Sequence, residues 1–199
     1  MSAVLAPPMP ASVGSLPPTP PLVTAEEFLR RHGDDSGIEL IDGHLVRLPM
    51  PGFQHAEVCG NAYALLREFV KPNRLGRVFS NDPFIRTKTD PDSYRGADVV
   101  FISYVTLPAT TPTPKGAITP PLELVVEVRS PTDSLNEMMA KALEYTDAGV
   151  TVVLLLDPEE RFAAVFRANQ LPQRLEPADT LTLPDVLPGF AVLVAQFFE

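Results

Sequence analysis

Two carboxylates and one lysine lie in or beside the most apolar segments of the chain. Asp98 lies near the entry of the apolar run 97–102, Glu127 interrupts the run 122–128, and Lys141 follows in the next segment. Two converging carboxylates suit a hard cation such as Mg²⁺, or Mn²⁺ in its place, because these ions prefer oxygen ligands. A nearby ammonium can orient or deprotonate a metal-bound water and offset charge on a phosphorane-like transition state. From spacing alone, the pattern fits a metal site and an ion pair buried in a core equally well.

The apolar run around Glu127 predicts a strand buried on both faces. It is rich in β-branched residues, and alternation along a strand places Glu127 on the same face as Val125 and Arg129. An ionised carboxylate buried without a partner costs several kcal/mol, roughly, after relaxation. Glu127 therefore needs a cation nearby, and the candidates are Arg129, Lys141 or a metal ion.

A helix is predicted after this strand. Ser134 and Glu137 have the spacing of a capping box, and Gly149 marks the end of the helix. Lys141 lies on the flank of the apolar stripe, from which its long side chain can reach back toward the sheet. A second apolar strand, 150–156, follows. The predicted stripe consists of Leu135, Met138, Met139, Ala142, Leu143 and Tyr145.

Two further polar residues lie on predicted elements near the start of the chain. Asp42-Gly43 between the runs 38–41 and 44–48 is a strong hairpin signal, and Glu39 projects from its first arm. A helix is predicted over 53–70, with His55 at its start on the buried side. Spacing alone favours an exposed strand carboxylate for Glu39 and a packing residue for His55, with a polar member of a site at the end of the sheet as the alternative for His55.

The rest of the chain yields shorter elements. Strands are predicted at 76–80, 83–87, 97–102, 162–167 and, more weakly, 171–176. Five prolines between positions 107 and 121 predict a loop, 183–190 is a turn-rich segment, and 192–198 is expected to be a final helix that docks on the core.

Composition limits the domain organisation. The 199 residues are 45% hydrophobic, which suffices for one domain, expected over 22–199. Seven prolines between Pro7 and Pro21 predict a disordered or polyproline-like tail over 1–21. The single cysteine, Cys59, excludes an internal disulfide, fits a cytoplasmic protein and is expected to be a small core residue. The apolar runs are far too short for a membrane span.

The charge distribution is uneven. A net charge of −9 argues against nonspecific affinity for nucleic acid. Between Arg67 and Arg95, however, seven basic residues stand against four acidic ones. On charge alone this segment is best interpreted as a solvated surface, and the alternative is a flank that faces phosphate.

Several motifs gain meaning when they are considered together. They are the run 124–131 (LVVEVRSP), Lys141 and Tyr145, Gly149 and the strand that ends in Asp157-Pro158, the run 39–43 (ELIDG), His55, and the run 187–190 (LPGF). With these motifs the chain resembles the Uma2 family of "putative restriction endonucleases", formerly a domain of unknown function. The resemblance covers nearly everything from Val23 to Phe198.

The family is similar to the PD-(D/E)xK nuclease superfamily, and the resemblance implies roles for individual residues. Asp98 takes the place of the motif aspartate and Glu127 that of the D/E position, so both become expected metal ligands. Glu39 and His55 match polar positions beside the site. Gly96-Ala97 replaces the usual proline before the aspartate. Arg129 occupies the place of the motif lysine, and because arginine is never deprotonated there, Lys141 resembles a migrated replacement.

The resemblance implies an α/β (mixed α+β) fold with a restriction-endonuclease-like core: a mixed central sheet flanked by helices, with an N-terminal hairpin. It implies an endonuclease that uses Mg²⁺ (or Mn²⁺) to hydrolyse DNA phosphodiester bonds, with Lys141 activating water. Because two-strand cleavage by this fold usually takes two active sites, a homodimer is expected. The alternative is a catalytically inactive module that binds nucleic acid or protein; the acidic net charge favours it, and the retention of Asp98, Glu127 and Lys141 argues against it.

Overall fold

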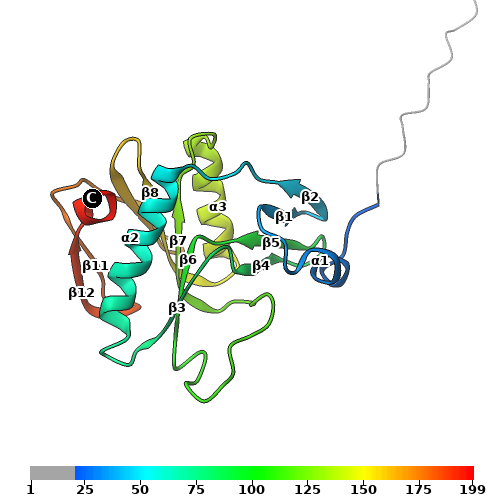
Figure 1. Ribbon diagram of the computed structural model, residues 1–199, viewed down its shortest axis with the longest axis horizontal. Coiled ribbons are helices and arrows are strands. Elements are labelled where there is room, and N and C mark those ends of the chain that lie inside the picture. The colour runs from blue at the N-terminus through cyan, green and yellow to red at the C-terminus, as the bar shows by residue number, and fades with distance from the viewer. Residues whose placement is uncertain (1–20) are drawn as a thin grey trace, which may run out of the picture.

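A six-stranded mixed sheet forms the centre of the protein, seen in the computed structural model, which describes residues 21–199 (Figure 1). Of the predicted tail, all but Pro21 lies outside the described residues. The strand order is β10-β9-β8-β7-β6-β3. The central pair, β7 (Leu122–Val128) and β8 (Val150–Asp157), is parallel and connected by helix α3 (Leu135–Asp147). The other pairs are antiparallel and add β3 (Gly76–Ser80), β6 (Val99–Ser103), β9 (Phe162–Phe166) and β10 (Gln173–Leu175).

Helices cover both faces of this sheet. Helix α2 (Phe53–Val70) buries Val58, Ala62, Leu66 and Val70 on one face. The hairpin of β11 (Thr180–Leu183) and β12 (Leu187–Leu193) and the 3₁₀ helix η1 (Val194–Phe198) complete the same layer. Helix α3 covers the opposite face, as Figure 1 shows. No helix within residues 21–199 is long and apolar enough to cross a membrane.

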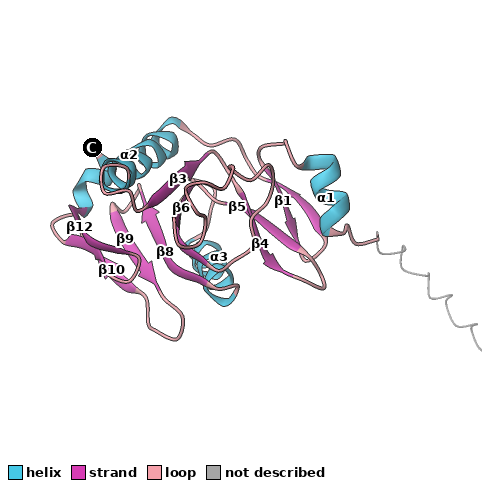
Figure 2. Cartoon of the chain, turned by 90° about the horizontal axis from the view of Figure 1, so that it is seen from below, coloured by secondary structure: helices cyan, strands magenta, loops and turns pink. Residues whose placement is uncertain are grey.

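A second, four-stranded sheet lies beside the first (Figure 2). Its order is β2-β1-β5-β4, formed by β1 (Ile38–Ile41), β2 (His44–Arg47), β4 (Phe84–Lys88) and β5 (Ser93–Gly96). The predicted hairpin joins β1 and β2, and both turn residues, Asp42 and Gly43, have positive φ, as this turn requires. Helix α1 (Ala25–His32) is anchored by Phe28, whose ring packs against Phe84 and Tyr94.

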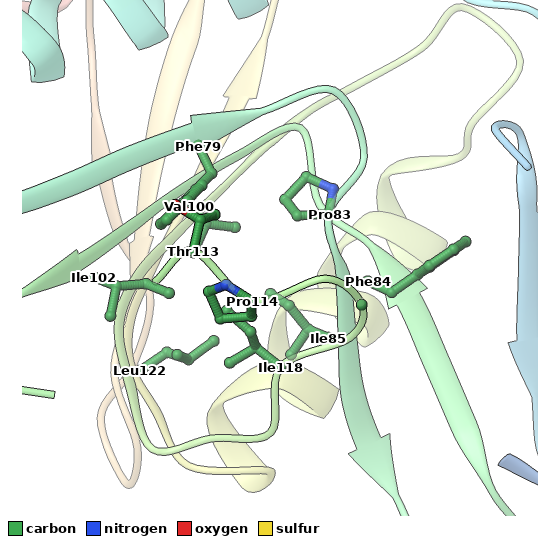
Figure 3. A pocket seen from close by; sticks show the side chains of 11 residues that line it. Phe79, Pro83, Phe84, Ile85, Val100, Ile102, Thr113, Pro114, Ile118 and Leu122 are labelled. Atoms are coloured by element: carbon green, nitrogen blue, oxygen red, sulfur yellow. The ribbon is translucent and has the colours of Figure 1, made fainter. Parts of the chain in front are cut away.

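The Pro-rich segment 107–121 is a loop, as predicted, and it packs across the junction of the two sheets. The backbone of Ile118 exchanges hydrogen bonds with Phe84 and Arg86 of β4, at 2.9 Å each. Pro114 and Ile118 lie over Val100 and Ile102 of β6 and close a small apolar pocket (Figure 3). The loop therefore ties the small sheet to the central one.

Strand register brings the two predicted carboxylates together. Val99 of β6 pairs with Val126 of β7, so Asp98, one residue before β6, lies beside the end of β7. The Asp98 carboxylate accepts a hydrogen bond from the Val128 amide at 2.7 Å. Residues 97 and 98 also connect β5 of the small sheet to β6 of the central sheet, so the site lies where the two sheets meet.

Several sequence predictions need correction. Residues 93–96 form strand β5, which was not predicted, and β6 begins at Val99 instead of residue 97. The turn-rich interpretation of 183–190 is correct for residues 184–186 and wrong beyond them, because Leu187–Leu193 is a strand paired with β11. Pro184 lies in the turn between the two strands, and Pro188 lies at the start of β12, where the pairing is irregular, so neither position requires an amide donor. The final helix is accordingly confined to Val194–Phe198.

Only half of the predicted apolar stripe of α3 is buried. Met138, Ala142 and Tyr145 pack against the sheet, whereas Leu135, Met139 and Leu143 remain 37–48% exposed. The physical reason is that a helix on a flat sheet can bury only one stripe of its surface. The row formed by Leu135, Met139 and Leu143 lies on the adjacent face of the helix.

The capping box of α3 provides a test of the local folding argument. Ser134 Oγ accepts from the Glu137 amide, and the Glu137 carboxylate accepts from the Ser134 amide. We expect Ser134→Ala to lower the free energy of unfolding by about 1 kcal/mol, because a helix-end amide loses its acceptor. Chemical denaturation measures the change.

Ser36→Ala is the matched control, since Ser36 is exposed between α1 and β1. It should change the free energy by less than about 0.5 kcal/mol. Equal effects of the two substitutions would contradict a stabilising cap.

Candidate active site

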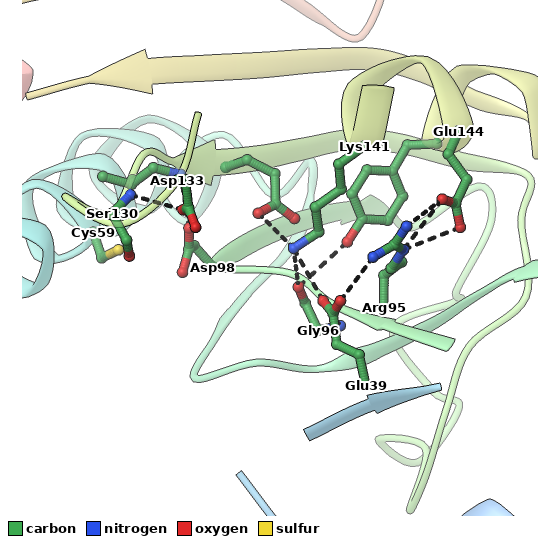
Figure 4. A network of polar contacts seen from close by, with 12 residues as sticks. Glu39, Cys59, Arg95, Gly96, Asp98, Ser130, Asp133, Lys141 and Glu144 are labelled. Carbon is green, nitrogen blue, oxygen red and sulfur yellow. Dashed lines mark hydrogen bonds and ion pairs between the residues drawn. The ribbon is translucent and has the colours of Figure 1, made fainter. Parts of the chain in front are cut away.

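Lys141 is the centre of a buried charge network (Figure 4). Its ammonium lies 2.9 Å from Glu127 Oε2 and 3.1 Å from Glu39 Oε1, and it donates to the Gly96 carbonyl at 3.0 Å. These groups come from α3, β7, β1 and the end of β5. Burial alone would lower the pKa of Lys141, but the carboxylates of Glu127, Glu39 and Asp98 outweigh it and hold the pKa above its usual value. Lys141 is therefore charged.

Arg129 is not the partner of Glu127. Its guanidinium pairs with the fully buried Asp157 at 2.9 Å and donates to the Asp133 carbonyl at 3.0 Å. Of the two protein cations that the sequence left open, the structure selects Lys141. The long helical side chain does reach back to the sheet, as expected from its position on the flank of α3.

Glu127 has one oxygen without a partner. Oε2 pairs with Lys141, whereas Oε1 is buried and has no hydrogen-bond partner among the described residues. Burial, with the nearby Asp98 and Glu39 carboxylates, raises the pKa of Glu127 to about 8, although Lys141 opposes the shift. A buried polar atom left unpaired in a native fold calls for an explanation, and a bound ion is one.

Asp98 links Glu127 to the start of α2. One Asp98 oxygen accepts from the Val128 amide, and the other, Oδ1, lies 3.4 Å from His55 Nε2. Burial would lower the pKa of His55, but the hydrogen bond and charge of Asp98 raise it above its usual value. His55 therefore lies against the Asp98 carboxylate, whereas spacing alone had favoured an ordinary packing residue.

Cys59 lies one helical turn after His55 and faces the same carboxylate. Its Sγ is 3.4 Å from His55 Nδ1. The side chain is partly buried and packs against the hydrophobic core, as expected, and it also lies beside the candidate site. Burial and the charge of Asp98 raise the pKa of the thiol.

Glu39 is held by a second layer of charge. Contrary to the exposed position expected from spacing, Glu39 is 1% exposed. Arg95 binds Glu39 Oε2 at 2.9 Å and Glu144 Oε2 at 2.6 Å, and the Gly96 amide donates to Glu39 Oε1 at 3.1 Å. Acidic and basic side chains thus alternate from Glu144 through Arg95, Glu39 and Lys141 to Glu127.

Sequence reasoning did not identify Arg95, Glu144 or Asp82 as neighbours of the site. The places of Arg95 and Glu144 beside the site depend on strand β5. The four residues of this strand show too little apolar alternation for it to be recognised from the sequence. Asp82 has a pKa raised by burial and by Asp98, and it lies in the loop before β4. The one signal that the sequence offered for these residues was that Arg95 and Asp98 lie on either side of Gly96.

The basic segment 67–95 does not present its side chains as one free flank. Arg86 pairs with Asp92, Lys88 with Asp42, and Arg95 with the two buried glutamates. Arg77 donates to carbonyls of the 107–121 loop. Most of these cations therefore stabilise the fold.

The residues of the site fit a hard divalent cation. Five carboxyl groups, from Glu39, Asp82, Asp98, Glu127 and Glu144, surround the two permanent cations Lys141 and Arg95. An excess of carboxylates would repel an anionic substrate. The orphaned Glu127 Oε1, with Asp98 beside it, supplies the oxygen donors that Mg²⁺ or Mn²⁺ would take.

Comparisons with known proteins agree with this architecture. The Uma2 family model, described as "Putative restriction endonuclease", matches residues 25–195. A crystal structure described as "a putative nuclease" from Anabaena variabilis superposes with a TM-score of 0.77 at 21% identity, covering 88% of this chain and 97% of that one. At this identity the likeness shows the fold. A search of curated proteins gives no match.

The mixed sheet with helices on both faces confirms the predicted fold class. The family description supports a nuclease activity. Because the family model spans most of the chain, including every residue of the charge network, the protein belongs to the Uma2 family.

Proposed function

We propose that the protein is an endonuclease that uses Mg²⁺ or Mn²⁺ to hydrolyse DNA phosphodiester bonds. The observation that carries this proposal is the buried, unpaired Oε1 of Glu127 beside Asp98, next to an ammonium that three acceptors hold in place. Asp98 and Glu127 would hold the ion. When bound, it supplies Lewis acidity to the scissile phosphate and lowers the pKa of a bound water.

Lys141 acts in this proposal as a fixed positive charge and not as a base. Its raised pKa keeps the ammonium protonated, so it would offset the negative charge that grows on the phosphate oxygens in the transition state. Glu39 is a positioning residue, because it holds Lys141 and is itself held by Arg95. His55 orients the Asp98 carboxylate.

The first prediction from this proposed function concerns cleavage. Glu127→Gln and Lys141→Met should each lower nicking of supercoiled plasmid in Mg²⁺ or Mn²⁺ by more than about 100-fold, because one removes a ligand charge and the other the fixed cation. Gel analysis of nicked and linear plasmid measures the rate. Direct conversion to linear DNA would support the expected homodimer.

Glu123→Gln and Lys115→Met are the matched controls. Glu123 lies at the other end of β7, bonded to Ser103 and Thr106, and Lys115 is exposed in the loop. Both should nick like the parent. Absence of nicking by the parent, with calorimetry showing no divalent-ion binding, would favour the inactive binding module.

The second prediction separates the role of Glu39 from that of the ligands. Glu39→Gln should slow nicking by about tenfold, since Lys141 loses one charged anchor, and leave Mn²⁺ affinity within about threefold of the parent. Nicking rates and calorimetry are compared on the same samples. Loss of Mn²⁺ binding would show that Glu39 is a ligand instead.

The third prediction concerns pH. A cation binds the ionised Glu127 only, and below its pKa of about 8 a proton competes. The apparent Mn²⁺ affinity should therefore rise as pH increases from about 6 and level off above about 8. Calorimetry across this range measures it. A pH response that is the same in Glu127→Gln would rule out Glu127 as its origin.

A further inference from the structure

A second set of ligand groups overlaps the proposed Mg²⁺ site. His55 and Cys59 lie one turn apart on α2 and so project from the same side of the helix. Asp98 faces both from the start of β6, and one ligand atom of each of the three lies within 4.8 Å of the others. None of the three residues is fully buried, and the side chains of His55 and Asp98 are 11% and 12% exposed.

The spacing of these atoms resembles the edges of a tetrahedral metal site. Zinc bonds of about 2.3 Å to sulfur and about 2.0–2.2 Å to nitrogen or oxygen place neighbouring ligand atoms about 3.4–3.6 Å apart. His55 Nε2 lies 3.4 Å from Asp98 Oδ1 and 3.9 Å from Cys59 Sγ. The nitrogen–sulfur distance would have to shorten by a few tenths of an ångström, roughly, around an ion, and the third distance, from Cys59 Sγ to the Asp98 carboxylate, is within 4.8 Å.

The ligand chemistry differs from that of the carboxylate pair. A thiolate and an imidazole favour Zn²⁺, Co²⁺ and similar ions, whereas Mg²⁺ takes oxygen ligands. Three protein ligands also leave a fourth position for water. The thiol proton would pass to solvent as the ion binds, which makes binding stronger at higher pH.

We propose that His55, Cys59 and Asp98 form a binding site for a thiophilic divalent ion such as Zn²⁺. Asp98 would serve both this site and the Mg²⁺ site, so Zn²⁺ would compete with Mg²⁺ and inhibit the enzyme. The inhibition rests on the proposed nuclease function, whereas ion binding by the three residues does not.

Cobalt absorption tests the site directly. Because the chain has one cysteine, a near-ultraviolet cobalt–thiolate band in the folded protein reports Cys59 alone. We expect one equivalent of Co²⁺ to produce the band and Zn²⁺ to abolish it. His55→Ala and Asp98→Asn should weaken Co²⁺ binding by at least about tenfold, since each removes one of three ligands.

Glu57→Ala, which removes an exposed carboxylate from the same helix, is the control and should bind Co²⁺ like the parent. Circular dichroism verifies that each variant is folded. Absence of the band in the parent would overturn the proposal. So would a band that persists at the parent's affinity in both His55→Ala and Asp98→Asn.

The competition is tested by Mn²⁺ calorimetry and by plasmid nicking, each with and without Zn²⁺. Zn²⁺ should weaken Mn²⁺ binding to the parent and slow its nicking in Mg²⁺. The same fractional inhibition of Cys59→Ala, measured relative to its own nicking rate without Zn²⁺, should require at least about tenfold more Zn²⁺.

Equal Zn²⁺ sensitivity of the parent and Cys59→Ala would overturn the competition. If the parent does not nick at all, the nuclease function fails, and the cobalt band and the Mn²⁺ calorimetry still decide whether the site exists.

Discussion

The neutralisation of buried charge at Lys141 is the constraint on which the rest of the site depends. An ammonium and several carboxylates taken from water into a protein interior each cost several kcal/mol, roughly, unless they pair closely. The protein meets this cost with a chain of alternating charges that extends from Glu144 to Glu127. Each member holds the next at hydrogen-bond distance, so the position of the ammonium is set by four segments of the fold.

This arrangement explains why Arg129 is not the cation beside Glu127. Residue 129 follows β7, and its side chain is drawn to Asp157 at the end of the neighbouring strand β8. The cation near Glu127 is instead Lys141 of helix α3, which packs on the same face of the sheet. A cation is needed at that point, and the chain supplies it from a different element.

Sequence patterns predicted the elements with the strongest local signals and missed those that depend on distant partners. The hairpin at Asp42-Gly43, the helix 53–70, the capping box at Ser134 and the buried strands around Glu127 were predicted because each has its own periodicity or turn chemistry. Strand β5 was missed because it is short and gains its stability from pairing with β1 and β4. Pairing with distant strands leaves little trace in a four-residue segment.

The residues of the candidate site also divide into those that local sequence signals predicted and those that depend on the fold. Asp98, Glu127 and Lys141 could be proposed from residue type and predicted strands, and the structure places them together. Glu39 and His55 came from the family resemblance, since spacing alone assigned them ordinary roles. Only the folded structure reveals the roles of Arg95, Glu144 and Asp82 and the orientation of Cys59. These residues meet only where the two sheets join.

The position of the site at the junction of the two sheets has a consequence for folding. Glu39 comes from the small sheet, Asp98 from the segment between the sheets, and Glu127 and Lys141 from the central βαβ unit. Contacts between such distant segments form late, because closing long loops costs entropy before the contacts repay it. A folding intermediate with only the central sheet would expose Lys141 without Glu39. The charge network should therefore assemble in the last cooperative step of folding, with the docking of the N-terminal hairpin.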